Sequence, residues 1–294
     1  MKILLFGENG QVGWELQRSL AVLGEIVALG RDSTDYCGDL ADHEGIRATV
    51  QTLRPDIIVN AAAYTAVDKA ESEPEHARRI NATAPGVLAE AAARQDAWLI
   101  HYSTDYVFDG SGSEPWVEED TPAPLSVYGQ TKLEGERLIQ RSGCPHLILR
   151  TSWVYAARGG NFAKTMLRLA QERDRLTVID DQVGAPTSAE LLADVTAHTI
   201  RHLQSHPQHG GLYHCVAAGE TTWHAYAQFV IEYARKAGSS IQTKEIAPIP
   251  TSAFPTPAQR PHNSRLDTRK LQATFDLTLP PWQQGVARLL TEIL

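Results

Sequence analysis

Residues 7–13 read Gly7-Glu8-Asn9-Gly10-Gln11-Val12-Gly13, and they lie between the apolar run Ile3–Phe6 and a segment with helical periodicity. Glycines between a strand and a helix permit a tight turn and let backbone N–H groups approach a pyrophosphate at the helix N-terminus. The spacing Gly-x-x-Gly-x-x-Gly differs from the Gly-x-Gly-x-x-Gly of simple dinucleotide-binding turns. A purely structural turn is the alternative. The stretch predicts that Gly7, Gly10 and Gly13 form a nucleotide-binding turn.

Short apolar runs alternate with amphipathic segments through the first half of the chain. The predicted strands are Ile3–Phe6, Ile26–Leu29, Asp56–Asn60, Trp98–Tyr102 and His146–Arg150. The predicted helices are Trp14–Leu23, His43–Leu53, Pro74–Arg94 and Thr131–Arg141. This alternation predicts an α/β fold with a Rossmann-type, doubly wound parallel sheet. Ligands should then gather outside the carboxyl ends of the strands.

The second half has a looser pattern, which predicts a smaller α/β lobe over the sheet for substrate binding. Helices are expected at Asn161–Arg173, Ser188–His202, Trp223–Lys236 and Trp282–Ile293, with a strand at Leu176–Ile179. Five prolines within residues 248–261 predict an irregular ordered loop. We expect residues 1–150 and 187–216 to form the NAD(P)-binding domain. Residues 151–186 and 217–294 should form the substrate-binding lobe.

Composition excludes several classes of protein. The 294 residues are 43% hydrophobic and 21% charged, and the formal net charge of −8 argues against a nucleic-acid surface. Cys37, Cys144 and Cys215 are scattered, which argues against a disulfide framework or a zinc ribbon. The apolar start is too short for a signal peptide, and no run approaches the roughly 18 apolar residues of a membrane span. We expect a cytoplasmic protein with no membrane or nucleic-acid partner.

The end of the second predicted strand bears on the choice of cofactor. An acid here would bind the ribose 2′-hydroxyl of NAD, but the chain has Gly30 and then Arg31. Arg31 can contact a 2′-phosphate through its planar fork, or it can be a solvated surface residue. Further on, Asp39 and Leu40 can flank an adenine ring. The small residues of Asn60-Ala61-Ala62-Ala63 suit a close passage of the cofactor.

The stretch Tyr128-Gly129-Gln130-Thr131-Lys132 places an acid catalyst beside a cation. Side chains four apart on a helix lie on one face. A tyrosine hydroxyl titrates near ~10, and a nearby ammonium lowers its pKa toward the useful range. Alone, the Tyr-x-x-x-Lys pattern also occurs by chance in helices. Ser103-Thr104-Asp105 follows the fourth strand and should emerge at the same edge of the sheet as the glycine turn.

Together, these motifs resemble the extended short-chain dehydrogenase/reductase superfamily over almost the whole chain. Four stretches resemble the dTDP-4-dehydrorhamnose reductases in particular, and they are residues 103–110, 153–155, 181–187 and 260–267. The resemblance implies reduction of a 4-keto sugar nucleotide with NADPH or NADH, the last step of dTDP-L-rhamnose synthesis for cell-surface polysaccharide such as O-antigen.

The resemblance also implies roles for individual residues. Tyr128 would protonate the carbonyl oxygen, and Lys132 would hold the nicotinamide ribose and lower the pKa of Tyr128. Thr104 would hydrogen-bond the reacting oxygen, while Asp105 and Trp153 would contact the dTDP-sugar. The family's cofactor contacts fall on Gly10, Gln11, Val12, Asp39, Leu40, Ala63, Tyr64, Thr65 and Tyr102. Relatives often carry an acid at position 30, so Gly30 indicates that NADPH is not disfavoured.

Related functions differ at identifiable positions. Nucleotide-sugar dehydratases use Thr-Asp-Glu to remove water, whereas the third residue here is Tyr106, which cannot replace a carboxylic acid at neutral pH. Epimerases of the superfamily usually have small residues after Ser-Ser or Ser-Thr. The regulatory subunit of methionine adenosyltransferase shares the fold but is a binding partner. The intact Thr104, Tyr128 and Lys132 favour a reductase.

Further candidate sites remain open in the sequence. His198, His202 and His206 recur every four residues, which suits either metal ligands or a frayed polar helix end. Glu15, Glu190 and Glu292 match positions at which some family members hold Mg²⁺ in a homodimer interface, and solvated helical glutamates are the alternative. Arg260 and Lys164 are candidates for the nucleotide base or diphosphate, or for ordinary surface roles.

Overall fold

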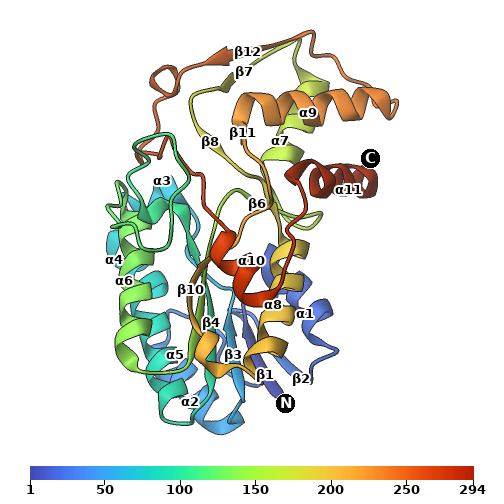
Figure 1. Ribbon diagram of the computed structural model, residues 1–294. Coiled ribbons are helices and arrows are strands. Elements are labelled where there is room, and N and C mark those ends of the chain that lie inside the picture. Colours follow the sequence, from blue (N-terminus) through green and yellow to red (C-terminus); the bar gives the residue numbers. More distant parts are fainter.

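Six parallel strands form the central sheet, in the order β10-β5-β4-β3-β1-β2. The computed structural model describes all of residues 1–294 (Figure 1). The strands are β1 (Lys2–Phe6), β2 (Glu25–Leu29), β3 (Ile57–Asn60), β4 (Trp98–Thr104), β5 (His146–Thr151) and β10 (Gly211–His214). The strand order reverses between β1 and β3, so a ligand crevice opens at their carboxyl ends. All five predicted strands are present, and β10 is an addition.

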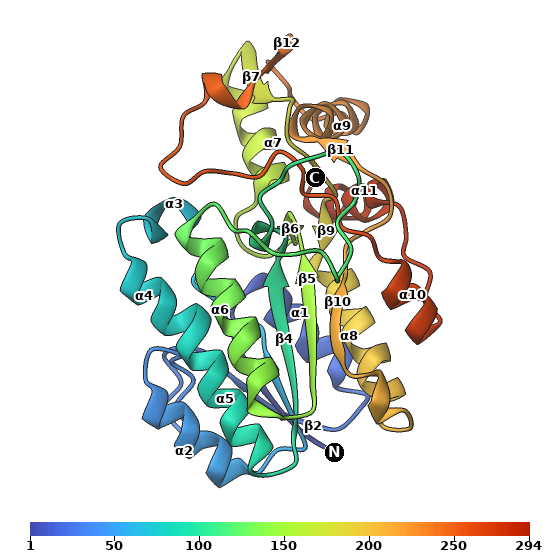
Figure 2. The same ribbon diagram turned by 60° about the vertical axis from the view of Figure 1, so that its left-hand side comes forward.

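Helices cover both faces of the sheet, as Figure 2 shows, which confirms the predicted doubly wound α/β fold. One face packs against α1 (Gln11–Leu20), α8 (Ala189–Leu203) and α10 (Arg269–Phe275). The other packs against α2 (His43–Leu53), α5 (Ala84–Ala93) and α6 (Val127–Ser142). The two hydrophobic clusters contain 20 and 19 buried residues, so the sheet is covered about equally on both sides.

The predicted helix Pro74–Arg94 is interrupted. It consists of α4 (Pro74–Arg78), a π-helical turn η1 (Arg79–Thr83) and α5. Pro85 has no N–H with which to continue the α-helical ladder, and a wide turn is one way to accommodate that loss. The carbonyl oxygen of Asn81 then lies 2.3 Å from where a Cβ would stand on Gly135 of α6. Only glycine permits this approach of η1 to α6.

The smaller lobe lies over the carboxyl ends of the sheet strands (Figure 1). Its three two-stranded sheets pair β6 (Val154–Tyr155) with β9 (Thr187–Ser188), β8 (Val183–Gly184) with β11 (Thr221–Thr222), and β7 (Arg175–Ile179) with β12 (Glu245–Ile249). Its helices α7 (Phe162–Glu172), α9 (Trp223–Lys236) and α11 (Trp282–Ile293) share a cluster of 14 buried residues. The irregular loop predicted at residues 248–261 is wrong at its start, because Pro248 and Ile249 pair with β7 as the end of β12. After β12 it contains one short 3-10 turn, Thr251–Ala253.

A buried ion pair joins α6 to the sheet. Arg150 of β5 donates from Nε and Nη2 to the two carboxylate oxygens of Glu136, at 2.9 and 2.7 Å. Both side chains are almost fully excluded from solvent, and the guanidinium lies 5.0 Å from the centre of the Phe108 ring. The bidentate geometry fixes both the height and the rotation of α6 relative to β5.

None of the helices combines the length and the hydropathy needed to cross a membrane.

Candidate active site

The turn between β1 and α1 approaches the backbone of the β3 edge closely. Gly7 has a φ of +94°, and a Cβ there would stand 2.8 Å from the backbone nitrogen of Ala62. A Cβ on Gly13 would stand 2.0 Å from the carbonyl oxygen of Gly7. Gly10 is the N-cap of α1 and makes no side-chain capping bond, so the first N–H groups of the helix remain available to an anion. The turn therefore fits a pyrophosphate.

This turn forms one end of a cleft of about 520 Å³. Eleven of the residues predicted to bind cofactor line it: Gly7, Gly10, Gln11, Val12, Arg31, Ala62, Ala63, Thr65, Tyr102, Tyr128 and Lys132. The cleft also contains Asn9, Gly30, Ala61, Ser103 and Val154, which belong to the motifs noted in the sequence but were not assigned a contact with the cofactor. Thr151, Gly159 and Gly160 were not singled out in the sequence. The structure thus brings the nucleotide-binding turn and the Tyr-x-x-x-Lys motif to one cavity.

Four residues predicted to bind cofactor do not line the cleft. Gly13 lies behind Gly7, and Leu40 is buried in the core between the sheet and α2. Asp39 accepts a hydrogen bond from the Ala41 N–H at 2.9 Å. Tyr64 donates from its backbone to Asn81 and from its hydroxyl to Glu73. Their role in binding stays a prediction.

Thr104 and Tyr128 meet where β4 ends and α6 begins. Ser126 caps α6 by accepting from the Gly129 N–H at 3.2 Å, which sets Tyr128 in the first turn. Burial raises the pKa of the Tyr128 phenol above its ordinary value, and hydrogen bonding with Thr104 opposes this shift. The Thr104 hydroxyl also donates to Asp105 Oδ1 at 3.0 Å. A fully protonated phenol beside a second hydroxyl suits general acid catalysis.

Lys132 does not act on Tyr128 as the sequence led us to expect. Its Nζ donates to the carbonyl oxygen of Tyr102 at 2.6 Å and contacts Nε2 of His101 at 3.2 Å. Burial lowers the pKa of Lys132 to about 8, with Glu136 opposing. The predicted lowering of the Tyr128 pKa is wrong for this structure, because burial dominates at the phenol and the ammonium is directed toward β4.

Sequence reasoning missed the buried pair beneath Lys132. Asn60 and His101 are register partners on β3 and β4, and each is only 1% exposed. Their side chains meet at 3.2 Å. The available signal was the presence of two polar residues within otherwise apolar parallel strands, where buried polar groups need a partner.

Asp105 and Trp153, the residues predicted to contact the sugar, follow β4 and β5, and neither is among the residues that line the cleft. Asp105 is 2% exposed and its Oδ2 has no hydrogen-bond partner. Burial raises its pKa to about 6, while the hydroxyls of Ser264 and Thr104 oppose the shift. Trp153 has a φ of +49° and stacks on Trp223, with ring centroids 3.6 Å apart. A strained aromatic residue and an unsatisfied buried carboxylate mark this region as a candidate ligand site.

Arg260 and Lys164, the two candidates for binding the nucleotide base or diphosphate, already donate hydrogen bonds within the protein. Arg260 donates to Asp68 Oδ2 at 2.7 Å and to the Tyr106 hydroxyl at 3.3 Å, so it joins the loop after β12 to the larger domain. Lys164 donates to the carbonyl oxygens of Ala157 and Gly159. Arg260 is therefore the better placed of the two, because it contacts a neighbour of Tyr128.

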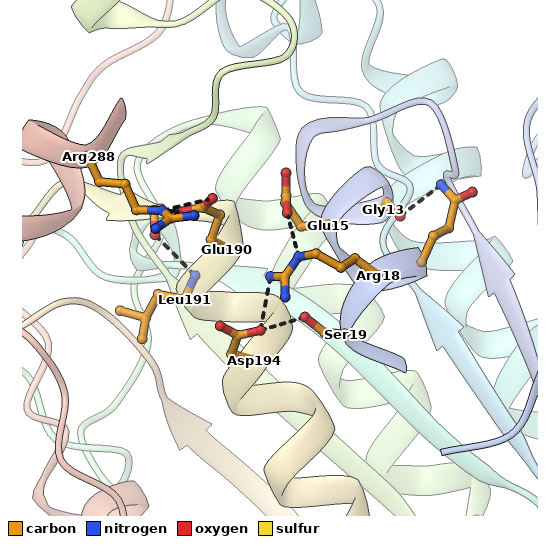
Figure 3. A network of polar contacts seen from close by, with 10 residues as sticks. Gly13, Glu15, Arg18, Ser19, Glu190, Leu191, Asp194 and Arg288 are labelled. Atoms are coloured by element: carbon orange, nitrogen blue, oxygen red, sulfur yellow. Dashed lines mark hydrogen bonds and ion pairs between the residues drawn. The ribbon is translucent and has the colours of Figure 1, made fainter. Parts of the chain in front are cut away.

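Glu15, Glu190 and Glu292 line a separate surface hollow of about 430 Å³, whose ion pairs are drawn in Figure 3. Arg18 pairs with Glu15 at 3.4 Å, and Arg288 pairs with Glu190 at 3.0 Å. Within this chain, no group of three or more His, Cys, Asp or Glu side chains is arranged to hold a metal ion. The expected Mg²⁺ site lies at a homodimer interface, so the arrangement of glutamates in one subunit does not test it, and it stays a prediction.

The predicted histidine row is also rearranged. His202 and His206 stack with His209, which follows Pro207, and His198 is not part of the stack. His202 Nε2 lies 2.8 Å from His209 Nδ1. This contact engages one ring nitrogen of each of these two histidines, and the side chains are not arranged as a metal-binding cluster.

Comparison with known proteins gives consistent matches over the full length. A family model described as the RmlD substrate binding domain matches residues 1–294. The dTDP-4-dehydrorhamnose reductase of Shigella flexneri is 61% identical over 293 residues, covering 100% of this chain and 98% of the relative. The reductase of Burkholderia thailandensis is 46% identical over 300 residues, with 100% and 99% covered.

Solved structures agree with these matches. A dTDP-4-dehydrorhamnose reductase from Clostridium acetobutylicum is 35% identical, with a TM-score of 0.89 and coverage of 100% and 99%. The Bacillus anthracis enzyme, solved in complex with NADP, is 33% identical, with a TM-score of 0.87 and coverage of 99% of each chain. A Thermus thermophilus UDP-glucose 4-epimerase, at 20% identity and a TM-score of 0.78, shares the fold.

The buried Asp105 carboxyl predicts a pH dependence of stability. Because its pKa is raised to about 6 in the folded protein, its stabilising contribution is present below the unfolded value near 3.8 and is lost as pH rises through 6. Asp105→Asn should therefore raise the free energy of unfolding at pH 7.5 by about 2–3 kcal/mol, since each pKa unit is worth about 1.4 kcal/mol. The substitution should also weaken the dependence of the free energy of unfolding on pH between pH 4 and 6.

Urea denaturation over pH 4–8 measures both effects. Asp109→Asn is the matched control, because Asp109 is on the same segment but only partly buried, with its pKa lowered by the Ser111 N–H. If Asp105→Asn lowered the free energy of unfolding at pH 7.5 and left its pH dependence unchanged, the ionised Asp105 carboxylate would not destabilise the folded protein.

Proposed function

Because the chain belongs to the RmlD family, whose members include the dTDP-4-dehydrorhamnose reductases, we propose that its cleft performs their reaction. In this reaction NAD(P)H reduces the 4-keto group of dTDP-4-dehydro-L-rhamnose to give dTDP-L-rhamnose for cell-surface polysaccharide. The observation that carries the proposal is that Tyr128 and Lys132 line the cleft that contains the glycine turn, while Thr104 hydrogen-bonds with Tyr128 at the end of β4.

The residues of the cleft fit a dinucleotide. The free N–H groups at the start of α1 suit the pyrophosphate, and the absence of Cβ atoms at Gly7 and Gly13 permits the close backbone approach. When bound, the reduced nicotinamide supplies the hydride. Lys132 lines the same cavity and can hold the nicotinamide ribose.

Tyr128 supplies the proton in this reaction. Its hydroxyl donates to the carbonyl oxygen as the hydride reaches C4, so the C=O bond becomes H–C–O–H and the phenol becomes a phenolate. The hydroxyl of Thr104 hydrogen-bonds the same oxygen and orients it. Because the phenol stays protonated far above neutral pH in this structure, the acid form is available throughout the physiological range.

Reduction fits the site better than dehydration or a purely regulatory role. Tyr106 stands where a dehydratase has its glutamate, and burial raises its pKa to about 12, so it carries no charge at neutral pH. A non-catalytic subunit has no need for the paired hydroxyls of Thr104 and Tyr128. Oxidation of NADPH on addition of the 4-keto sugar nucleotide distinguishes an enzyme from a binding subunit.

Tyr128→Phe is expected to abolish most turnover and leave cofactor affinity nearly intact. Only the hydroxyl is lost, and general acid catalysis typically contributes ~10²–10⁴ in rate. Single-turnover kinetics and fluorescence titration with NADPH measure the two quantities. Tyr106→Phe is the control, since that phenol packs edge-on against Tyr128 but donates no proton in the proposal. Unchanged single-turnover rates for Tyr128→Phe would remove it from the acid role.

We also propose that NADPH is accepted at least as well as NADH. Arg31 lines the cleft, and its side chain is 78% exposed. Its Nε pairs with the exposed Asp32 at 3.5 Å, a solvent-screened contact that a 2′-phosphate can displace. An opposing feature is Glu8, whose Oε1 lies 2.9 Å from where a Cβ would stand on Gly30. The carboxylate of Glu8, from the glycine turn, therefore lies close to the place that an acidic side chain at position 30 would occupy.

The two residues should shift cofactor preference in opposite directions. Arg31→Ala should lower the NADPH/NADH ratio of kcat/KM about tenfold, the low end for a charge-assisted contact because the site is exposed. Glu8→Gln should raise the ratio. Steady-state kinetics with both cofactors test this, and Arg158→Ala serves as a control cation packed on Trp14 outside the cleft. A ratio unmoved by Arg31→Ala would contradict the assignment.

We further propose that two copies of the chain associate through the hollow that contains Glu15, Glu190 and Glu292, with Mg²⁺ between them. Arg18 pairs with Glu15 and Arg288 pairs with Glu190, whereas Glu292 has no ion pair. Bringing two such surfaces together would place carboxylates opposite carboxylates, and Mg²⁺ favours carboxylate oxygens while retaining water ligands.

A Mg²⁺-dependent homodimer should dissociate when the ion is removed. Sedimentation in Mg²⁺ and then in excess EDTA, at one protein concentration, measures the change. Glu190→Gln should weaken association, whereas Glu172→Gln, which removes an exposed carboxylate paired with Arg168, should not. A protein that is monomeric in both buffers, or dimeric in both regardless of Glu190→Gln, would contradict the proposal.

The lobe formed by residues 151–186 and 217–294 is proposed to receive the dTDP-sugar, with Asp105 and Trp153 at the contact. The stack of Trp153 on Trp223 supports this, because it offers aromatic surface next in sequence to Val154, which lines the cleft. All three cysteines are free, which suits a reducing compartment such as the cytoplasm.

A further inference from the structure

A chain of polar contacts runs beneath the cleft from one wall to the other. The Ala62 N–H donates to Asn60 Oδ1 at 3.2 Å, and Asn60 Nδ2 lies 3.2 Å from His101 Nδ1. His101 Nε2 lies 3.2 Å from Lys132 Nζ. Asn60, His101 and Lys132 are all at most 2% exposed, while Ala62 and Lys132 both line the cleft. The chain therefore connects the backbone after β3 with the lysine of α6.

The direction of each hydrogen bond follows from the first one. Because the Ala62 N–H needs an acceptor, the amide oxygen of Asn60 faces Ala62 and the amide nitrogen faces His101. The Asn60 amide must then donate, so Nδ1 of His101 accepts. Burial is the main cause that holds the pKa of His101 well below its usual range, so the ring is neutral and carries its one proton on Nε2.

This proton faces Lys132 Nζ, and the two forms of the lysine respond differently. An ammonium group has three donors and no acceptor, so it would oppose the Nε2–H. A neutral amine accepts from Nε2–H with its lone pair and still donates to the Tyr102 carbonyl at 2.6 Å. The ammonium form would require the proton to move to Nδ1 and the Asn60 amide to turn, which breaks its bond to Ala62.

The charged groups around Lys132 do not remove this preference. Glu136, one turn further along α6, favours the ammonium form, but it is bonded to Arg150 of β5. On α4, Arg78 pairs with Glu134. On η2 (Asp105–Val107), Asp105 and Tyr106 act on Tyr128, and Arg260 next to them pairs with Asp68 of α3 (Val67–Ala70). Burial outweighs these groups and lowers the pKa of Lys132 to about 8.

We propose that Asn60 and His101 are positioning residues that couple the charge of Lys132 to the backbone at Ala62. In the cofactor-free protein, Lys132 is then a neutral amine whenever His101 is protonated on Nε2. A ligand that moves the backbone at Ala62 would therefore change the proton affinity of Lys132. The inference deepens the proposed reductase function and rests on it for the role of Lys132.

The experiment follows Lys132 directly in the cofactor-free, full-length protein. The chain has seven lysines, so ¹³Cε-lysine labelling gives few NMR signals, and Lys132→Arg assigns the one of interest. The Lys132 signal should titrate with a midpoint near pH 8. His101→Gln can present its amide oxygen to Nζ, so it should raise the midpoint by at least about one pH unit, because a hydrogen bond to the charged form favours it.

Thr196→Val is the matched control. It removes a buried hydrogen bond from the Tyr102 hydroxyl, next to His101 on β4, without touching Lys132. Its Lys132 midpoint should equal that of the wild type. A wild-type midpoint above pH 10, or a midpoint unchanged by His101→Gln, would overturn the inference.

A second measurement needs no variant and therefore does not depend on the folding of His101→Gln. ¹⁵N-histidine spectra of the wild type should show His101 protonated on Nε2 at pH 9, and protonation on Nδ1 would overturn the inference. Neither spectrum requires turnover. Reduction of the 4-keto sugar by a protein with the wrong titration would contradict this inference alone, and the expected titration without turnover would contradict the proposed function alone.

Discussion

The ion pair between Glu136 and Arg150 is the constraint on which the geometry of the cleft depends. Taking two charges out of water is costly, and the bidentate contact repays this cost only in one relative placement of α6 and β5. Lys132 lies one helical turn before Glu136, and Tyr128 lies one turn before Lys132. A shift of the helix along the sheet would therefore break the pair and misplace both residues at once.

The opposite wall is set by backbone contacts rather than by charge. The close approach of Gly7 to Ala61 and Ala62 holds the glycine turn against the end of β3. Asn60 then ties the same segment to β4 through His101. The cleft thus lies between a helix fixed by an ion pair and a turn fixed by the absence of side chains. Both restraints belong to the larger domain, so these two walls of the cleft do not depend on the side chains of the smaller lobe.

The sequence predicted the fold correctly, and it predicted that the glycine turn and the Tyr-x-x-x-Lys motif lie at one edge of the sheet. The five apolar runs and the glycine turn predicted the sheet, and the turn and the Tyr-x-x-x-Lys motif do share a cavity. The strand β10 escaped notice because its four residues, Gly211–His214, include a glycine and a histidine and show no apolar run. The π-helical turn at Arg79–Thr83 was missed because helical periodicity alone does not mark one extra residue per turn.

The atoms contacted by long side chains could not be predicted. Spacing along α6 places Tyr128 and Lys132 on one face, but the flexible stem of lysine lets Nζ reach β4 instead of the phenol. In the same way, Glu8 reaches the space beside Gly30 from another strand end, and His101 finds Asn60 across the sheet. These contacts depend on strand order, which periodicity does not encode.

The wide turn at Arg79–Thr83 has a consequence for how the length of this chain can change. Each α-helical residue turns the chain by about 100°, since 3.6 residues complete a turn. Removing one residue from η1 would rotate α4 about the axis of α5 by that angle and carry Asn81 away from Tyr64, which it now holds by two hydrogen bonds. The local structure can accommodate substitutions in this segment. Deletion of one residue, in contrast, would reorient the chain between Tyr64 and η1. Related sequences should therefore vary in composition here and keep their length.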